Sequence, residues 1–177
     1  MTLKAVEVVK YNERWPDMFT FEHELLNSVL SPQNVAAIHH IGSTSVVGLH
    51  AKPVIDILIE VNSLDMLDGE NSNMASIGYV AKGEYGIAGR RYFQKGGEHR
   101  THQAHAFLTG SENALRHLAF RDYLIAFPAV AKEYAALKLQ GANICANNID
   151  IYCAHKDSFI KEYEAKALEW MHAGKSE

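Results

Sequence analysis

The residues best suited to chemistry in this chain are a Gly-Ser-Thr-Ser run at Gly42, Ser43, Thr44 and Ser45, and the carboxylate Asp56 that follows it. The run has the composition of a turn that opens a short helix. Free backbone N–H groups at such a turn, together with the helix dipole, suit a phosphate. Asp56 lies in a β-branched run that predicts a buried strand over 54–61. We therefore predict a site for a nucleotide or another phosphorylated small molecule, with Asp56 as the catalytic group if the chain is an enzyme.

A carboxylate inside an apolar strand is costly to bury without a partner. For Asp56 the residues leave three partners open: a metal ion, backbone N–H groups, or an ion pair with Arg90 or Arg91. The residue two positions on, which shares the same face, is Leu58. Glu60 also shares that face, but four residues of strand span about 13 Å, whereas two-metal phosphoryl transfer needs ions about 3.5–4 Å apart. Leu58 therefore argues against conventional two-metal transfer.

A later strand, predicted over 100–108, is the next source of ligands. Its alternate residues share a face, so Gln103 and His105 lie together if that face meets Asp56. Aspartate with imidazole suits a transition metal better than magnesium. Asp56, His105 and Glu84 are the candidate metal ligands, for Mg or Mn, with Zn as the alternative. The competing interpretations are a hydrogen-bonded core histidine at His105, and a Glu84 that holds Arg90.

Basic residues gather between positions 89 and 105, where four of them stand against one acid in a chain of net charge −4. This pattern suits a small anionic ligand better than a long polyanion and argues against nucleic acid as a partner. Arg90 and Arg91 point to opposite faces if they lie in a strand, so one reaches the ligand as a bidentate phosphate fork. Lys52 is a further phosphate contact or an exposed loop lysine.

Four residues are expected to support the site: His40, Gln103, His117 and Arg121. His40 enters the Gly-Ser turn, and we expect it to brace that turn by hydrogen bonds. His117 and Arg121 are four residues apart on a predicted helix, so both can face the sheet. They form either a basic wall of the pocket or a local ion pair with the neighbouring Asp122.

The apolar spacing predicts an α+β fold, a mixed sheet flanked by helices with a helical C-terminal portion. We expect strands over 35–41, 54–61, 79–83, 90–94 and 102–108, and a helical turn over 43–49. Helices are expected over 12–30, 64–77 and 156–171, from 111, and from 128 to about 140. The whole chain, 1–177, is predicted to be one domain, with a sheet core over about 35–108 and a helical tail over about 111–173.

Composition sets further bounds: 47% of the residues are apolar and 21% are charged, which is ordinary for a globular protein. The sequence has neither an apolar run long enough to span a bilayer nor the apolar core of a signal peptide. We therefore predict a cytoplasmic protein without a membrane partner. The two cysteines, Cys145 and Cys153, fit no zinc spacing and are interpreted as inert thiols. Oligomeric state stays open.

Several segments together resemble one known family. They are residues 40–48 (HIGSTSVVG), 52–57 (KPVIDI), 83–93 (GEYGIAGRRYF), 100–105 (RTHQAH), 117–123 (HLAFRDY) and 128–138 (PAVAKEYAALK), continued by Tyr152, Lys156, Phe159 and Ile160. This combination resembles the GrpB family over nearly the whole chain. The resemblance implies a nucleotidyltransferase-like fold of poorly defined activity, and some members are fused to a kinase of coenzyme A biosynthesis. The superfamily motif places a second acid where this chain has Leu58, and relatives usually have histidine where it has Gln103.

Three functions follow for comparison with the structure. The first is metal-dependent nucleotidyl or phosphoryl transfer with Asp56 as the essential ligand. The second is a non-catalytic binding module that kept the phosphate turn and lost the second acid. The third is a single-metal hydrolase that uses Asp56, His105 and either Glu84 or His40.

Overall fold

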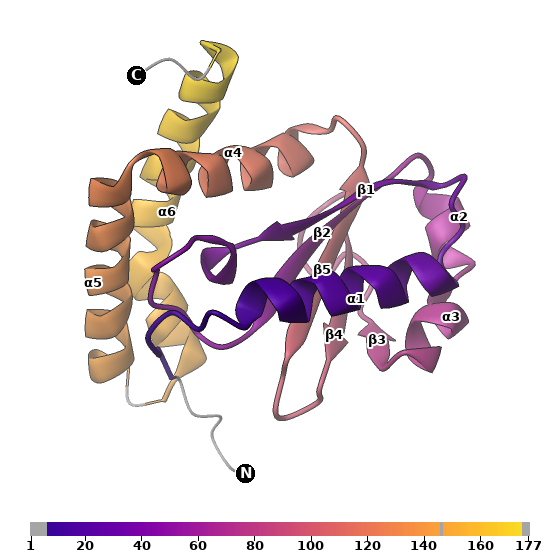
Figure 1. The fold of residues 1–177 in the computed structure, drawn as a ribbon, viewed down its shortest axis with the longest axis horizontal. Helices are drawn as coiled ribbons and strands as arrows, with labels where there is room; N and C mark the ends of the chain where they lie inside the picture. The colour runs from indigo at the N-terminus through magenta and orange to yellow at the C-terminus, as the bar shows by residue number, and fades with distance from the viewer. Residues whose placement is uncertain (1–6, 146, 175–177) are drawn as a thin grey trace.

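The computed structural model describes residues 7–145 and 147–174, which form a mixed five-stranded sheet with a helical tail against one side (Figure 1). The strand order is β1-β2-β5-β4-β3. The β2–β5 pair is parallel and the other pairs are antiparallel. The strands are β1 Val35–Ile41, β2 Ile55–Val61, β3 Tyr79–Ala81, β4 Arg91–Lys95 and β5 His102–Leu108. This arrangement confirms the predicted α+β class.

The strand β2 is central, and its β-branched sequence is explained by burial on both faces. Of its seven residues, all described, only Asp56 is not buried. In the ladder, Asp56 stands beside Ile41 of β1 and beside Gln103 of β5. The register therefore brings the carboxylate to the last residue before the Gly-Ser turn and to the face of β5 that the alternation predicted.

The helix α1, Trp15–Val29, covers one face of the sheet (Figure 1). Its buried side chains, among them Trp15 and Leu26, share a core cluster with Ile57, Ile59 and Phe93 of the strands. Two short helices, α2 Leu64–Asp68 and α3 Asn71–Ser76, connect β2 with β3. In the described part of the chain, no helix has both the length and the apolar character needed to cross a bilayer.

The tail consists of α4 Glu112–Ala126, α5 Pro128–Ile144 and α6 Ile149–His172. A second cluster joins it to the segment after the Gly-Ser turn, because Val46 and Leu49 pack with Leu124 and Tyr134. Figure 1 shows α5 and α6 standing side by side next to this segment. The tail is thus packed against the same turn that the sequence singled out for phosphate binding.

Two helix predictions need correction. The single helix predicted over 64–77 is two helices, because α2 ends at Asp68, before Gly69, and Glu70 leaves the helical conformation. The last helix begins at Ile149 instead of 156, because the side chain of Asn148 accepts from the N–H groups of Asp150 and Ile151. Ile149 and Ile151 are exposed, so the first turns of α6 lack the apolar periodicity on which the prediction depended.

Candidate functional site

The Gly-Ser turn sits directly on the carboxylate of Asp56. Gly42 has φ 72° and ψ −173°, a conformation that is essentially restricted to glycine, and it leads into the short 3-10 helix η1, Ser43–Ser45. A Cβ atom added at Gly42 would lie 2.8 Å from Oδ2 of Asp56. The hydroxyl of Ser45 donates to the carbonyl of Gly42. The glycine is therefore required both by its backbone conformation and by the carboxylate beneath it.

The turn is braced from two sides. Nε2 of His40 lies 2.8 Å from the hydroxyl of Thr44, and the imidazole stacks on Phe19 of α1. From α4, Arg121 donates to the carbonyl of His40 at 3.2 Å and also pairs with Asp122. Burial lowers the pKa of His40 to about 4, with a further lowering by Arg121 against a raising effect of Asp56. The ring is therefore neutral at pH 7.

Two residues of β5 hold Asp56. Nε2 of His105 lies 3.3 Å from Oδ1, and Gln103, with its amide nitrogen toward Asp56, donates to the same oxygen at 3.0 Å. The amide oxygen of Gln103 then accepts from Arg100 at 3.2 Å. Within the described residues, no arginine forms an ion pair with Asp56. Strand alternation placed Gln103 and His105 together, and the structure brings both to Asp56.

A buried arginine sets the tautomer of His105. Arg90 lies 3.4 Å from Nδ1 of His105. A guanidinium can only donate, so Nδ1 must accept and the ring proton must be on Nε2, facing Asp56. Two more of its five N–H donors go to the carbonyls of Glu84 and Tyr85, at 3.1 and 2.7 Å, and its guanidinium lies over the ring of Tyr92. Arg90 is buried and orients His105.

The other charged candidates of this region lie apart from Asp56. Arg91 pairs with Asp68 of α2, with Nε 2.7 Å from Oδ1. The carboxylate of Glu84 accepts from the backbone N–H of Gly89 at 2.6 Å and closes the loop before β4. The structure therefore does not bring Arg91 or Glu84 to the Gly-Ser turn.

His117 of α4 lies behind His105. Its ring is tilted against the rings of His105 and Phe107, with centroids 5.5 and 5.7 Å apart. Burial lowers the pKa of His117 to about 3, and His105 contributes to the lowering. A neutral, buried His117 packs the site from behind and adds no positive charge to it.

The helical tail contributes two lysines that the sequence reasoning did not select, Lys138 of α5 and Lys156 of α6. Lys138 is 2% exposed, and among the described residues its Nζ has no hydrogen-bond partner. This Nζ lies over the ring of Tyr134 at 4.6 Å, and Ser43 of the turn lowers the pKa of that tyrosine against the larger raising effect of burial. A sequence signal existed, because Lys138 is four residues after the buried Tyr134 and three before the buried Gly141.

Lys52 joins these two lysines. Lys52 and Lys156 lie 5.6 and 4.8 Å from the ring centroid of Tyr152. Burial lowers the pKa of each of the three lysines, and the charge of Asp56 acts on all of them in the opposite direction. For Lys138, burial and the charge of Lys156 bring the pKa down to about 6. The three lysines therefore interact electrostatically with one another and with Asp56. We call Lys52, Lys138 and Lys156 the lysine cluster.

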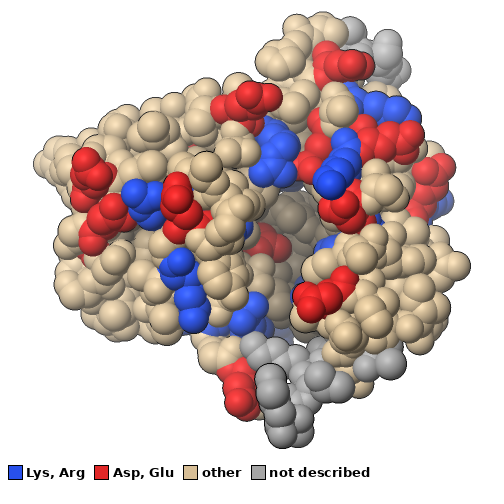
Figure 2. Space-filling view, turned by 180° about the vertical axis from the view of Figure 1, so that it is seen from behind, with Lys and Arg blue, Asp and Glu red and all other residues tan. Residues whose placement is uncertain are grey.

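Seen from behind, the molecule has a hollow between its sheet and its tail (Figure 2). Basic and acidic side chains both stand at the margin of this hollow, and acidic colour also shows on its inner wall. We call this hollow the crevice. Asp56 is on β2, whereas Lys138 and Lys156 are on α5 and α6.

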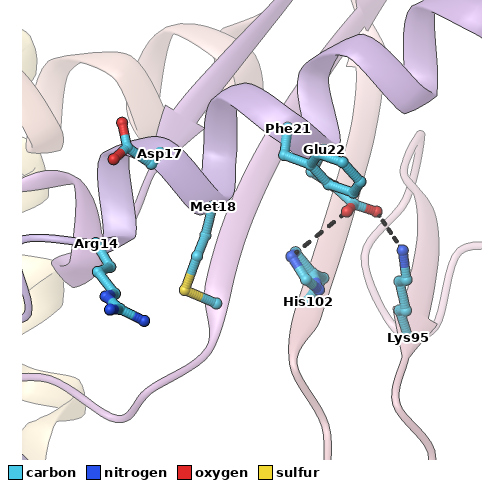
Figure 3. Close-up of a pocket in the computed structure, with 7 residues that line it drawn as sticks. All are labelled: Arg14, Asp17, Met18, Phe21, Glu22, Lys95 and His102. Carbon is cyan, nitrogen blue, oxygen red and sulfur yellow. Dashed lines mark hydrogen bonds and ion pairs between the residues drawn. The ribbon is translucent and has the colours of Figure 1, made fainter.

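A second hollow, of about 470 Å³, lies beneath α1 and offers a contrast (Figure 3). It is lined by the buried Glu22 of α1, which accepts from the hydroxyl of Tyr79 and from Nζ of Lys95, each at 2.8 Å. Nε2 of His102 lies 3.6 Å from its other oxygen. The charge of Glu22 is therefore balanced by Lys95 within the protein, whereas Asp56 is the one carboxylate that acts on all three residues of the lysine cluster.

The predicted metal ligands do not converge. Among residues 7–145 and 147–174, no group of three or more His, Cys, Asp or Glu side chains lies close enough to hold a metal ion. Asp56 and His105 are neighbours, but the Nε2 of His105 carries the proton that faces Asp56, and its Nδ1 faces Arg90. One carboxylate and a protonated nitrogen are a poor donor set for a divalent cation.

Fold and site together define an α+β protein with a crevice between its sheet and a helical tail. The chain belongs to the GrpB family, whose description is "GrpB protein" and whose pattern matches residues 5–166. It is 49% identical over 167 residues to the UPF0157 protein YqkA of Bacillus subtilis, covering 94% of this chain and 48% of that protein. It is 35% identical to the glutamate-rich protein GrpB of Alkalihalophilus pseudofirmus, covering 89% of this chain and 92% of that one.

A solved structure agrees with the fold. The crystal structure of the conserved protein GrpB from Enterococcus faecalis has a TM-score of 0.88 and 41% sequence identity, covering 92% of this chain and 98% of that one. Because the chain spans only 48% of YqkA, what that longer protein does is carried to this chain only as a proposal.

The close approach of Gly42 to Asp56 predicts the effect of a substitution. Gly42→Ala should lower the free energy of unfolding by about 2–4 kcal/mol, since backbone strain of about 1–3 kcal/mol adds to the contact with Oδ2. The matched control is Gly48→Ala, at φ 83° but with no described atom within 4 Å of the added Cβ. It should lose only the backbone contribution, about 1–2 kcal/mol. Urea unfolding measures both, and equal losses would contradict the contact.

The neutral His40 predicts a pH dependence of stability. Its folded-state pKa of about 4 lies below its ordinary value of 6.5, so the unfolded chain binds more protons and stability falls as the pH drops from 6.5 toward 4. His40→Gln cannot titrate. Its loss of unfolding free energy between pH 7 and pH 5 should be smaller than that of the unsubstituted protein by roughly 1–2 kcal/mol. Parallel profiles from urea unfolding would contradict the assignment.

Proposed function

We propose that this chain binds a nucleotide or another phosphorylated small molecule in the crevice, with its phosphate at the Gly42–Ser45 turn. The observation that carries the proposal is the contact between Gly42 and Asp56 at the foot of η1. It fixes a left-handed glycine at the start of a turn whose hydroxyls and N–H groups suit phosphate oxygens. The braces from His40 and Arg121 hold that turn in place without a ligand.

The charges around the turn favour an anion. Lys52, Lys138 and Lys156 outnumber the one carboxylate that acts on them. The basic residues Arg90 and Arg91 are engaged elsewhere, so the phosphate contacts of this proposal are the turn and the lysine cluster. The absence of a second acid beside Asp56 favours the non-catalytic binding module among the functions considered from the sequence.

A second candidate function is metal-dependent nucleotidyl or phosphoryl transfer. The observation that favours it is the exposure of Asp56, whose side chain is 29% accessible although its strand neighbours are buried. Mg or Mn would be held by Asp56, with His105 able to join only after giving up its proton. A single-metal hydrolase would use the same pair with Zn.

The first test is thermal stability against a panel of nucleotides and coenzyme A precursors, each with Mg, Mn, Zn or a chelator. A ligand present at 100 times its dissociation constant should add roughly 2.7 kcal/mol to the free energy of unfolding. A shift that survives chelator supports the binding module, and a shift that needs metal and a nucleotide supports transfer. A shift from metal alone supports the hydrolase. No shift with any phosphorylated compound would contradict the proposal.

Asp56→Ala separates binding from transfer. If a panel member is turned over, this variant should lose all turnover while its fold, measured by circular dichroism, is kept, because in this candidate function Asp56 is the essential metal ligand. Full activity of Asp56→Ala would exclude Asp56 as the metal ligand. In the binding module the same variant should bind phosphorylated ligands at least as tightly, since it removes a negative charge beside the lysine cluster.

A further inference from the structure

We propose that a third hollow, between α5 and the segment that follows η1, binds a small carboxylic acid with an apolar body. Its volume is about 640 Å³, within the range of about 300–1,000 Å³ that is typical of small-molecule sites. We call it the tail hollow, and its lining residues lie within 46–50, 124–125 and 128–139. The lining includes neither the Gly-Ser turn nor Asp56 nor the lysine cluster, so this inference goes beyond the proposed function and is independent of it.

Part of the lining is fixed by the packing of the protein itself. Val46, Leu49 and Leu124 line the tail hollow. Each of them is buried, and all three pack with Tyr134 in the core cluster that joins the tail to the segment after η1. These walls are therefore held in place by contacts that need no ligand. A site formed in advance loses little conformational entropy when a ligand binds.

The helix α5 presents a separate apolar stripe to the tail hollow. The apolar residues of this stripe stand three or four positions apart, the spacing of one helix face, and they include Pro128, Ala131, Ala135 and Leu139. The buried residues of α5 lie on a different face and are Tyr134, Lys138 and Gly141. The helix is thus apolar on the face that packs in the tail and also on the face that lines the hollow.

Apolar side chains of the lining are left in contact with solvent. Val47 is 80% exposed, Ile125 is 52% exposed and Leu139 is 37% exposed. These three come from three separate segments of the chain and meet at one hollow. A concave group of exposed apolar side chains marks a binding site, because an apolar ligand would remove them from water.

The ionisable residues of the lining select the charge of the ligand. They are Lys132 and His50, and the described lining contains no aspartate or glutamate. Neither side chain has an ion-pair or hydrogen-bond partner among the described residues. An ammonium group donates, and an imidazole has an N–H donor in either protonation state. A carboxylate can accept from both, whereas a ligand ammonium would meet a like charge.

The two parts of the ligand contribute differently to binding. Lys132 is exposed, and exposed ion pairs add little free energy. The affinity should therefore come mainly from the apolar body, while Lys132 and His50 set its orientation and its sign. A small molecule also fits better than a protein partner. Thirteen residues line the tail hollow, whereas a stable protein interface uses about 20–30 residues on each side.

The experiment is isothermal titration calorimetry of the full chain with hexanoate, octanoate and decanoate, each below the concentration at which it forms micelles. We expect one molecule bound per chain, and at least 10-fold tighter binding of decanoate than of hexanoate, since each buried CH₂ group adds to the affinity. Decylamine has the same chain and the opposite charge, and it should bind at least 10-fold more weakly than decanoate. Equal affinities for decanoate and decylamine, or no binding of any of the three acids, would overturn the inference.

Two variants test the location, each with a matched control. Ala136→Trp places an indole in the tail hollow from an exposed position and should weaken decanoate at least 10-fold. Ala129→Trp makes the same change on an exposed residue of α5 outside the lining and should stay within 2-fold. Lys132→Met should reduce the preference for decanoate over decylamine at least 3-fold. Lys82→Met removes another exposed lysine and should leave that preference unchanged. Circular dichroism checks that all four keep the fold.

Two further results would overturn the inference. If Ala136→Trp binds decanoate as the unsubstituted protein does, the ligand is not in the tail hollow. If analytical ultracentrifugation shows a dimer that Ala136→Trp dissociates, a second copy of the chain covers the hollow and the small-molecule site is excluded. None of these measurements uses a phosphorylated compound, so their failure leaves the proposed function standing. In the same way, a panel of phosphorylated compounds without effect would leave the tail hollow standing.

Discussion

The contact between Gly42 and the carboxylate of Asp56 is the constraint on which the rest of the site depends. It brings the end of β1 so close to the start of β2 that a Cβ atom at Gly42 would lie 2.8 Å from Oδ2 of Asp56. Because the carboxylate lies on a strand that is otherwise buried, its remaining oxygen needs donors from β5, and His105 and Gln103 supply them. Arg90 in turn donates to Nδ1 of His105, and the loop carbonyls of Glu84 and Tyr85 accept hydrogen bonds from Arg90. One close approach is thus linked to polar contacts on β2, on β5 and in the loop before β4.

The helical tail affects the site around Gly42 and Asp56 in two ways. Through Val46, Leu49 and Tyr134 it buries apolar surface against the segment that follows the turn, which fixes where α5 stands. Through Lys138 and Lys156 it adds two lysines whose pKa values the charge of Asp56 raises against the effect of burial. The first effect stabilises the fold and the second does not, because the lysines have no internal anion beyond Asp56. The polar network under α1, where Glu22 meets Tyr79 and Lys95, shows how the same fold handles a buried charge that needs no ligand.

Much of this arrangement could be predicted from residue patterns. The strand Val35–Ile41 was predicted with its bounds, and alternation along the later strand placed Gln103 and His105 on one face. Those predictions succeed because a period of two is imposed by strand geometry alone. The brace from Arg121 and the role of Arg90 were not predictable in detail, since both depend on backbone carbonyls of distant loops. The burial of Lys138 was missed because a lysine on a helix is normally expected to face solvent. Its burial depends on how the neighbouring helices pack, which the sequence pattern does not show.

The family resemblance predicted the fold more firmly than it predicted the chemistry. The GrpB pattern covers residues 5–166 and therefore includes both the sheet and most of the tail. That extent agrees with a crevice that needs both parts. The two residues at which the sequence analysis expected a difference from relatives are near Asp56. Leu58 is two residues further along β2, and Gln103 stands beside Asp56 on β5.

The topology also has a consequence for how the site is assembled. Asp56 is on β2, whereas Lys156 is on the last helix, so the two groups are joined by the folding of a long stretch of intervening chain. Contacts of such high sequence separation form late, because the entropy of closing the loop must be overcome before they stabilise anything. During synthesis the ribosome releases α6 after the strands and the Gly-Ser turn. The sheet that carries Asp56 is therefore complete before Lys156 can reach it.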